Sequence, residues 1–477
     1  MYYRNYVQKM IAQFAEDDQN RTALMLYDGK QVTEISYRCL AERILRAANY
    51  FKNNGLTQRH IALISGNCWE WIIASFAIAA SGNVVVPVNP ALSGETILEL
   101  CAAADVSVIC GDRQDVEAYA QDYRCVFYEM LSGENPMCVE EICATDGDAT
   151  VMLLFTSGTT GDSKAVEISY ANMESSIKSA EGVFSEPGIS RISIVLPMFH
   201  IAGIRGALAM LYRYKTLCIG RGVKYLFRDM PVLLPDYITL VPMILESLVK
   251  IIRRTTREDL RNNFIGHNLK RICVGGATID ADDCRFLIQE GFTVDCAYAM
   301  SETTGVGTWG EWDERHPGAL GKLSEELQYR IVDGEIQFKG GPVMKGYYKD
   351  PEATNCALED GWLHTGDLGF CDENGNLYLT GRKKNLIVMP NGEKLNPEEV
   401  ERYFAGCNAI VECLVCFGDH DKALCLEVFA KDQDAVRKYV ERYNEITPLS
   451  HNIRKTVYHD KPLERTTNGK LIRKERL

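Results

Sequence analysis

Long uninterrupted hydrophobic runs are missing from this sequence of 477 residues. Residues 71–93 carry no charge, but Gly82, Asn83 and Pro87 interrupt the apolar stretch. A membrane-spanning helix needs about 20 predominantly apolar residues without such breaks. The first residues also lack the apolar segment of a secretory signal. We therefore expect no membrane span.

Excess positive charge is missing as well. The formal net charge at pH 7 is −13, whereas a protein that binds nucleic acid through its phosphates needs a basic surface. We therefore expect no nucleic-acid partner. The apolar fraction of 46% is typical of folded domains rather than disordered chains, and a length of 477 residues predicts two or more domains.

Cysteine spacing indicates neither a disulfide framework nor a zinc site. The 17 cysteines are scattered through apolar segments. Cys413 and Cys416 form a C-x-x-C pair, but no second pair follows at the spacing of a zinc site, so a strand is expected there. Reduced thiols are typical of the cytoplasm, which is the location we expect.

Strand and helix patterns alternate along the first part of the chain. Apolar residues at helical spacing predict a helix over 36–54, and a buried helix is expected over 69–80. Residues 61–64 and 84–88 are expected to be strands that are apolar throughout. Such strands are typical of a parallel sheet covered on both faces, so the predicted fold class is α/β with doubly wound sheets. After residue 317, Asp333-Gly334 and Asn374-Gly375 predict antiparallel hairpins.

A loop rich in glycine and hydroxyl groups lies between two apolar segments. Its sequence is Thr156-Ser157-Gly158-Thr159-Thr160-Gly161-Asp162-Ser163-Lys164. Glycine lets backbone N–H groups approach an anion, hydroxyls add donors, and a lysine supplies the positive charge that phosphate oxygens need. The loop departs from the Walker A pattern, because two residues separate Gly161 from Lys164. It predicts a phosphate loop of another kind.

Four later segments make the comparison specific. They are Tyr298-Ala-Met-Ser-Glu302, Thr365-Gly-Asp-Leu368, Gly381-Arg-Lys-Lys-Asn385 and Thr467-Asn-Gly-Lys470. Together with the loop, they resemble in order the motifs of the AMP-forming adenylate ligases, which include acyl- and aryl-CoA synthetases, luciferases and adenylation domains. Ser163 stands where that family usually has proline. The segment Phe199–Gly203 and the compact length are similar to o-succinylbenzoate–CoA ligases.

The resemblance implies how the phosphates of ATP bind. The loop, including Thr160 and Lys164, would hold the β- and γ-phosphates. Glu302 would hold Mg²⁺ through carboxylate oxygen, the ligand type that this cation prefers. Ser301 keeps a hydroxyl where the family has threonine. Thr160 and Glu302 would thereby take part in catalysis as well as in binding.

The resemblance also implies how the nucleoside binds. Asp367 would accept hydrogen bonds from both ribose hydroxyls, as a carboxylate can, and Arg382 would approach the ribose or the phosphates. The adenine would lie against the backbone around Gly276 and Ala277, with the ring of Tyr298 on its other face.

Two domains follow from the same resemblance. Residues 1–381 would form a large adenylate-forming domain, including a small distorted β-barrel, and 382–477 a small mobile α/β cap. Lys470 would bridge the substrate carboxylate and the α-phosphate as a catalytic residue. Lys384 would be the hinge about which the cap rotates, withdrawing Lys470 and bringing residues 389–395 to line a tunnel for the acceptor thiol.

The acid substrate is expected beside residues 196–203, which resemble the family segment that leads into the acyl pocket. His200 would lie next to the acid or serve as a core histidine. Arg205 would either meet a second carboxylate on the substrate or lie at the surface. Trp309 suggests an apolar or aromatic acid. An amino-acid substrate is disfavoured, because residues 192–227 contain no carboxylate that could hold its α-ammonium group.

These expectations describe an AMP-forming carboxylic acid–CoA ligase that uses ATP, Mg²⁺ and CoA. An alternative is a stand-alone adenylation enzyme that loads a carrier-protein phosphopantetheine, since both thiols would enter the same tunnel. A catalytically degenerate nucleotide-binding protein is a third interpretation. The presence of the motif residues disfavours it: Lys164, Glu302, Asp367, Arg382 and Lys470.

Replacing Lys470 with alanine should abolish formation of the acyl-adenylate, because two anions meet there and need a positive charge between them. Thioester formation from supplied acyl-adenylate should persist. Pyrophosphate release measures the first step, and thioester yield measures the second. Loss of both steps would contradict this role.

Overall fold

The computed structural model describes residues 5–156, 163–180, 188–276, 279–389, 393–418, 423–465 and 471–473. The chain divides into two compact units. The first contains the described residues up to 328 together with 338–363, and the second contains 329–337 together with the described residues from 364 onward.

The helices of the first unit alternate with its strands. They are α1 (Tyr6–Ala15), α2 (Tyr37–Asn53), α3 (Trp69–Ala80), α4 (Gly94–Ala103), α5 (Arg113–Val116), α6 (Tyr170–Lys178), α8 (Ile201–Tyr212), α9 (Leu226–Leu233), α10 (Pro242–Ile252), α11 (Arg257–Leu260), α12 (Ala281–Gln289) and α13 (Pro351–Ala357). Helical turns of other types are η1 (Glu117–Tyr119), η2 (Tyr128–Ser132), η3 (Val139–Glu141), η4 (Val223–Tyr225), η5 (Arg261–Ile265) and η6 (Ser301–Thr303).

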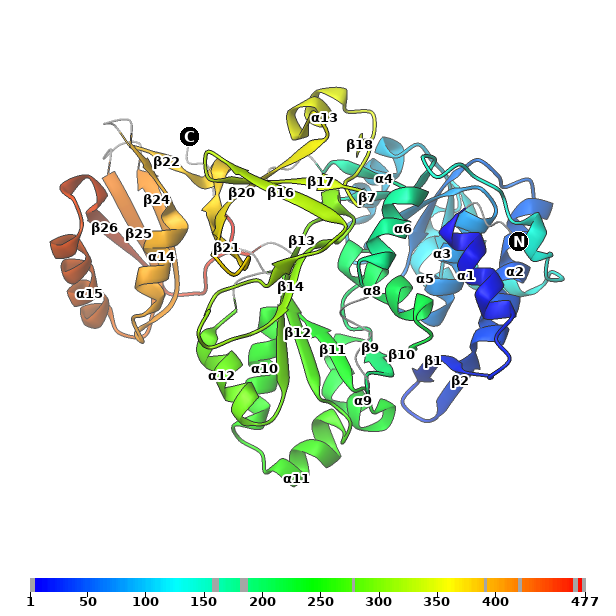
Figure 1. Cartoon of the computed structure of the whole chain (residues 1–477), viewed down its shortest axis with the longest axis horizontal. Coiled ribbons are helices and arrows are strands. Elements are labelled where there is room, and N and C mark those ends of the chain that lie inside the picture. Colours follow the sequence, from blue (N-terminus) through cyan, green and yellow to red (C-terminus); the bar gives the residue numbers. More distant parts are fainter. Residues whose placement is uncertain are drawn as a thin grey trace. The chain divides into compact units, whose positions relative to one another are not determined.

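A nine-stranded sheet forms one layer of the first unit (Figure 1). In spatial order its strands are β15 (Lys322–Leu323), β14 (Gly307–Glu311), β13 (Thr293–Ala299), β12 (Arg271–Gly275), β11 (Tyr237–Leu240), β9 (Arg191–Ser193), β10 (Thr216–Ile219), β1 (Thr22–Tyr27) and β2 (Val32–Ser36). The strands from β13 to β1 run parallel, and antiparallel strands lie at both edges.

A seven-stranded sheet forms a second layer of the same unit. Its strands are, in spatial order, β18 (Gly346–Tyr347), β8 (Ala165–Ser169), β7 (Thr150–Phe155), β4 (Val84–Val88), β3 (His60–Ile64), β5 (Val106–Gly111) and β6 (Arg124–Phe127). The strands from β7 to β6 are parallel, and β8 and β18 run antiparallel to their neighbours. The predicted α/β class with doubly wound sheets is confirmed.

Helix α2 illustrates how local sequence sets these elements. Ser36 precedes it, and the Ser36 side chain accepts a hydrogen bond from the Cys39 N–H at 3.3 Å. Gly55 follows its end with a φ of +65°.

The charge-free stretch after residue 70 forms buried α3 and β4, as expected. Within the described ranges, none of the helices has both the length and the apolar character to cross a bilayer.

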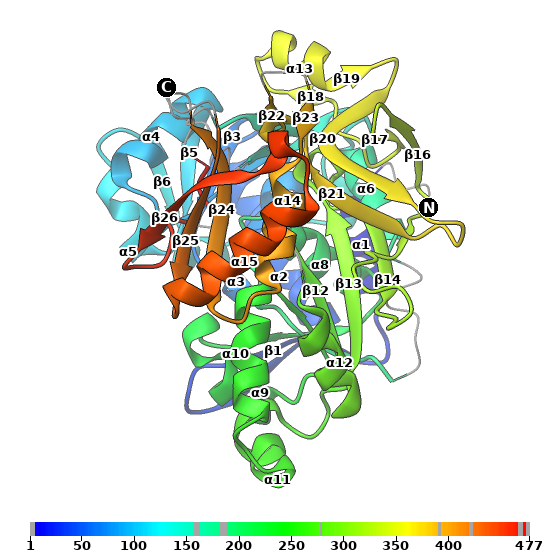
Figure 2. The same ribbon diagram turned by 90° about the vertical axis from the view of Figure 1, so that its left-hand side faces the viewer.

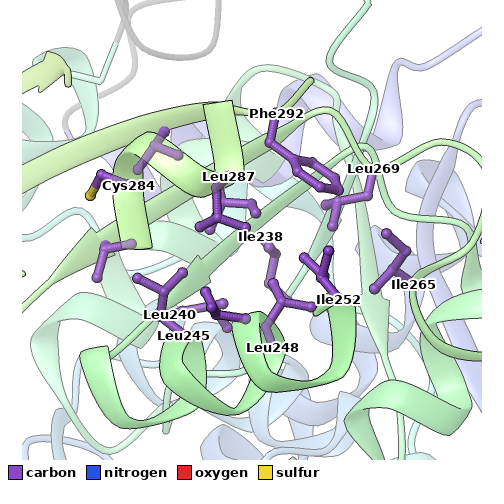
Figure 3. Packing of buried hydrophobic residues seen from close by; sticks show 14 of the residues in the cluster. Ile238, Leu240, Leu245, Leu248, Ile252, Ile265, Leu269, Cys284, Leu287 and Phe292 are labelled. Atoms are coloured by element: carbon purple, nitrogen blue, oxygen red, sulfur yellow. The ribbon is translucent and has the colours of Figure 1, made fainter. Parts of the chain in front are cut away.

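A hydrophobic core fixes the parallel strands that lead to the candidate site. Leu245 and Leu248 from α10 and Leu287 from α12 pack against Ile238 and Leu240 of β11 (Figure 3). All five side chains are almost completely buried. Removing this apolar surface from water provides the main free energy that holds the helices on the sheet.

The strands expected after residue 317 form a five-stranded sheet. This is the region in which the resemblance implied a small distorted β-barrel. In spatial order it contains β16 (Leu327–Val332), β17 (Glu335–Gly340), β20 (Trp362–Cys371) and β19 (Leu358–Glu359), and β21 (Leu377–Arg382) pairs with β20. Asp333 and Gly334 have φ values of +50° and +79°, which is the left-handed geometry of a tight hairpin. The predicted hairpin is confirmed.

The last part of the chain folds around a three-stranded sheet (Figure 2). Its elements are η7 (Lys383–Asn385), β22 (Ile387–Val388), β23 (Lys394–Leu395), α14 (Pro397–Ala405), β24 (Ile410–Gly418), β25 (Ala423–Ala430), α15 (Gln433–Ile446), η8 (Leu449–His451) and β26 (Ile453–His459). Phe404 of α14 contacts Tyr443 of α15, with ring centroids 5.1 Å apart. Cys413 and Cys416 lie on β24, as the strand prediction required.

A buried ion pair joins two neighbouring strands of the nine-stranded sheet. Arg271 of β12 and Asp295 of β13 meet through Nε–Oδ2 at 2.6 Å and Nη2–Oδ1 at 2.9 Å. Asp295 is completely buried, and Arg271 is 5% exposed. Neither charge can return to water without opening the sheet.

The variant Asp295→Asn should lower the free energy of unfolding by about 3–5 kcal/mol, because it removes the buried carboxylate that binds the Arg271 guanidinium at two points and leaves the more distant, exposed Glu311 carboxylate at 3.8 Å. Urea unfolding measured by tryptophan fluorescence reports the change. The matched control is Glu42→Gln, which removes an exposed pair with Arg46 and should cost about 0.5 kcal/mol or less. Equal effects of the two variants would refute this explanation.

Candidate active site

The two ends of the phosphate loop are closed by backbone pairing. β7 and β8 are antiparallel with Phe155 opposite Ala165, and the Thr156 N–H donates to the Lys164 carbonyl at 3.0 Å. The expected connection between two strands is therefore confirmed. Six residues of this loop lie outside the described residues: Ser157, Gly158, Thr159, Thr160, Gly161 and Asp162.

Tyr347 connects the loop to the candidate magnesium ligand. Its hydroxyl donates to Glu302 Oε1 at 3.0 Å, and the Lys164 ammonium lies 5.1 Å from the centroid of its ring. Burial and the Glu302 carboxylate raise the pKa of Tyr347 above its usual range, so the hydroxyl keeps its proton and remains a donor. Sequence analysis missed Tyr347, because a short Gly-Tyr-Tyr segment has no motif pattern and becomes informative only when β18 pairs with β8.

Glu302 is held in a way that suits a single-carboxylate magnesium site. It belongs to η6, next to Ser301, and its backbone carbonyl accepts a hydrogen bond from the Met344 N–H at 2.8 Å. No described residue donates to its Oε2. One free carboxylate oxygen fits Mg²⁺, which keeps several waters and takes further oxygens from phosphates. Among the described residues no group of three or more His, Cys, Asp or Glu side chains could hold a metal on its own.

The candidate adenine site lies at the carboxyl ends of two parallel strands. Gly276 follows β12 and has a φ of +88°, and Tyr298 lies near the end of β13, whose Ala297 is opposite Gly275. The ring of Tyr298 packs 6.2 Å from that of Phe338. Ligands of open α/β sheets bind at this edge. Gly276 and Tyr298 are therefore brought together as expected, whereas Ala277 lies outside the described residues.

Asp367 and Arg382 form a two-point ion pair within the second unit. Arg382 Nε lies 2.6 Å from Asp367 Oδ1, and Arg382 Nη2 lies 3.3 Å from Oδ2. The residues are opposite each other in the β20–β21 pair. Asp367 is 4% exposed, while Arg382 is half-buried. The structure therefore brings together two of the residues that the resemblance assigned to the nucleotide.

Glu335 organises the turn that carries Asp367, and the sequence analysis missed this residue. Glu335 is 3% exposed and accepts from the Gly366 N–H at 3.0 Å, from Lys383 Nζ at 2.8 Å and from the His364 ring at 3.3 Å. Burial alone would raise the pKa of Glu335, but these contacts hold the pKa below its usual value. The only signal in the sequence was an acid directly after the Asp333-Gly334 turn.

The predicted hinge and the basic tail lie in the second unit. Lys384 is exposed within η7, next to the Lys383 that Glu335 binds. Lys470 lies outside the described residues. On either side of it, Arg465 pairs with Glu412 at 2.8 Å and Arg473 pairs with Glu401 at 2.5 Å. Both arginines are therefore bound by acids of the second unit.

The segment expected at the acid pocket begins helix α8. His200 is the residue before its first turn, is half-buried, and has its ring 4.8 Å from that of Phe199. Arg205 is also half-buried and donates to the hydroxyls of Ser176 and Ser179. The alternative of a surface arginine at 205 is therefore wrong, because the side chain turns inward against α6.

The variant Tyr347→Phe should raise the Mg²⁺ concentration for half-maximal pyrophosphate release about tenfold, because the orienting hydrogen bond to the Glu302 carboxylate is lost. The ring beneath Lys164 remains. The matched control is Tyr348→Phe, whose hydroxyl binds Asp105 instead and should leave the Mg²⁺ dependence unchanged. An unaltered Mg²⁺ dependence in Tyr347→Phe would count against the proposed role of this contact.

Comparison with known proteins places the chain in a family. The model "AMP-binding enzyme" matches residues 11–348, and "AMP-binding enzyme C-terminal domain" matches 384–477. A 2-succinylbenzoate–CoA ligase from Bacillus mycoides is 25% identical over 96% of this chain and 95% of its own length. The peroxisomal OPC-8:0-CoA ligase 1 of Arabidopsis thaliana is 26% identical over 82% and 78%.

The fold is shared with solved structures. The Bacillus subtilis o-succinylbenzoate CoA synthetase MenE in complex with AMP has a TM-score of 0.84 at 24% identity, covering 97% of both chains. ATP-bound MatB from Rhodopseudomonas palustris also has a TM-score of 0.84, at 23% identity and 97% coverage of both chains. This chain belongs to the AMP-binding enzyme family, which confirms the predicted class of AMP-forming acid–thiol ligase.

Proposed function

We propose that this enzyme activates a carboxylic acid with ATP, releases pyrophosphate and transfers the acyl group from the acyl-adenylate to CoA. The observation that carries the proposal is the arrangement of Lys164, Tyr347 and Glu302. The Lys164 ammonium, suited to phosphate, lies over the Tyr347 ring, and the Glu302 carboxylate, suited to Mg²⁺, accepts from the Tyr347 hydroxyl. The names of the relatives support CoA as acceptor, and a MenE structure with ATP and magnesium ion supports both ligands.

In the first reaction a carboxylate oxygen attacks the α-phosphorus, and the bond to pyrophosphate breaks. The main requirements are charge compensation and in-line positioning. Lys164 supplies positive charge at the end of the phosphate loop, and Asp367 accepts from the ribose hydroxyls. When bound, Mg²⁺ supplies further charge compensation at the phosphates. Lys470 bridges the two reacting anions in this proposal.

In the second reaction the thiol of CoA attacks the acyl carbonyl, and AMP leaves. We assign this step to domain alternation between residues 1–381 and 382–477, with Lys384 as the hinge. The family models support this boundary, because they match 11–348 and 384–477 separately. Residues 389–395 would replace Lys470 beside the adenylate, although 390–392 lie outside the described residues.

The acceptor thiol has an alternative. A carrier-protein phosphopantetheine could take the place of CoA, since the same type of thiol would attack the same adenylate. A degenerate nucleotide-binding protein is disfavoured, because the described motif residues Lys164, Glu302, Asp367 and Arg382 are intact. A cytoplasmic location is proposed because the spacing of the 17 cysteines matches no disulfide framework.

The decisive measurement is pyrophosphate release with a panel of aliphatic, aryl and dicarboxylic acids, with and without CoA. We expect release with one class of acid and multiple turnovers only when CoA is present. Release that stays stoichiometric with CoA, but turns over with a holo-carrier protein, would favour the alternative acceptor. No release with any acid would contradict adenylate chemistry.

A further inference from the structure

Arg205 is a cation of the first unit whose hydrogen-bond partners among the described residues are all uncharged. Its Nε donates to Ser176 Oγ at 3.2 Å, and its Nη2 donates to Ser179 Oγ at 2.9 Å. Its Nη1 has no hydrogen-bond partner among the described residues, and none of them offers Arg205 a carboxylate. The buried Arg271 of the same unit, by contrast, is paired with Asp295.

The groups around Arg205 do not compensate its charge. The titratable groups whose fields act on it are Tyr237 of β11 and Cys273 of β12. Burial raises the pKa of Tyr237 well above its usual value and raises the pKa of Cys273 to about 12, so both are neutral at physiological pH. Burial lowers the pKa of Arg205 to about 10, which still leaves it protonated. An unpaired cation in such surroundings is costly unless an anion joins it.

Arg205 lies where the helix that follows the segment assigned to the acid pocket meets the glycine-containing turn after Glu302. It is in the second turn of α8, which begins after His200, and helical side chains lean toward the N-terminal end of their helix. A Cβ on Gly305 would come within 2.9 Å of Arg205 Cδ, so the arginine stem packs directly on this glycine. Gly305 follows Glu302 by three residues, and the neighbouring Thr304 carbonyl accepts from Ser176 Oγ at 2.6 Å.

We infer that Arg205 binds a second carboxylate of the acid substrate, so that the enzyme selects dicarboxylic acids. The inference rests on the proposed function and names the substrate class for the same site. One carboxylate would be activated by ATP. The other would accept hydrogen bonds from the guanidinium N–H groups that have no other partner and would neutralise the charge, as in arginine–carboxylate pairs. Ser176 and Ser179 hold the guanidinium in place before the acid arrives.

Matched acids that differ only in the second carboxylate test this inference. Suitable pairs are adipate with hexanoate, and 2-succinylbenzoate with 4-oxo-4-phenylbutanoate. Binding to the full-length enzyme is measured by calorimetry without ATP, and kcat/KM for pyrophosphate release is measured separately. We expect at least one dicarboxylate to exceed its monocarboxylate partner about 30-fold or more in both measurements.

The variant Arg205→Met removes the charge but keeps the length of the stem, and it should abolish this preference while sparing turnover of the monocarboxylate. Arg205→Lys should retain part of it. The matched control is Arg213→Met at the other end of α8, which should leave the preference unchanged. If Arg205→Met lowered both members of every pair equally, or if the wild-type enzyme bound both equally, the inference would be overturned. Preferential binding without pyrophosphate release would uphold the inference and contradict the proposed function instead.

Discussion

Opposite charges and hydrogen-bond donors hold the buried carboxylates that join strands and turns in the described part of this protein. Asp295 is completely buried because Arg271 binds both of its oxygens. Asp367 is buried against Arg382, and Glu335 against Lys383 and a backbone N–H. The paired residues lie 15, 24 and 48 residues apart in the sequence, so each ion pair fixes the position of one strand or turn relative to another. Arg205 departs from this pattern, and the departure makes it informative.

The candidate site uses the same constraint to bring chemistry together. A lysine at the end of one hairpin and a glutamate beyond the end of another strand carry opposite charges, yet they do not pair directly in the described geometry. Tyr347 lies between them, with its hydroxyl on the carboxylate and its ring beneath the ammonium. Both charged groups therefore remain available to a phosphate and a cation while their positions stay correlated. A direct salt bridge would have to be broken before either could bind nucleotide.

Much of the fold and part of the site follow from local sequence. The helix over 36–54 was predictable because a serine cap, apolar periodicity and a terminal glycine all indicate the same element. The Asp333-Gly334 hairpin was predictable because few residues adopt its backbone geometry. The motif residues could be identified because their types and order are specific. Tyr347 and Glu335 could not, since a tyrosine after glycine and an acid after a turn occur in many settings.

The sequence by itself determined the α/β class, the family and the residue types available for binding ATP. Propensity, apolar periodicity and motif spacing are properties of short segments, and they remain visible before the chain folds. Only the tertiary structure decided which carboxylate meets which donor, that Arg205 turns inward, and that Arg465 and Arg473 are bound by acids. These outcomes depend on contacts between segments up to about 180 residues apart, such as that between β8 and β18. The burial and charge that such contacts create are properties of the packed chain rather than of any one segment.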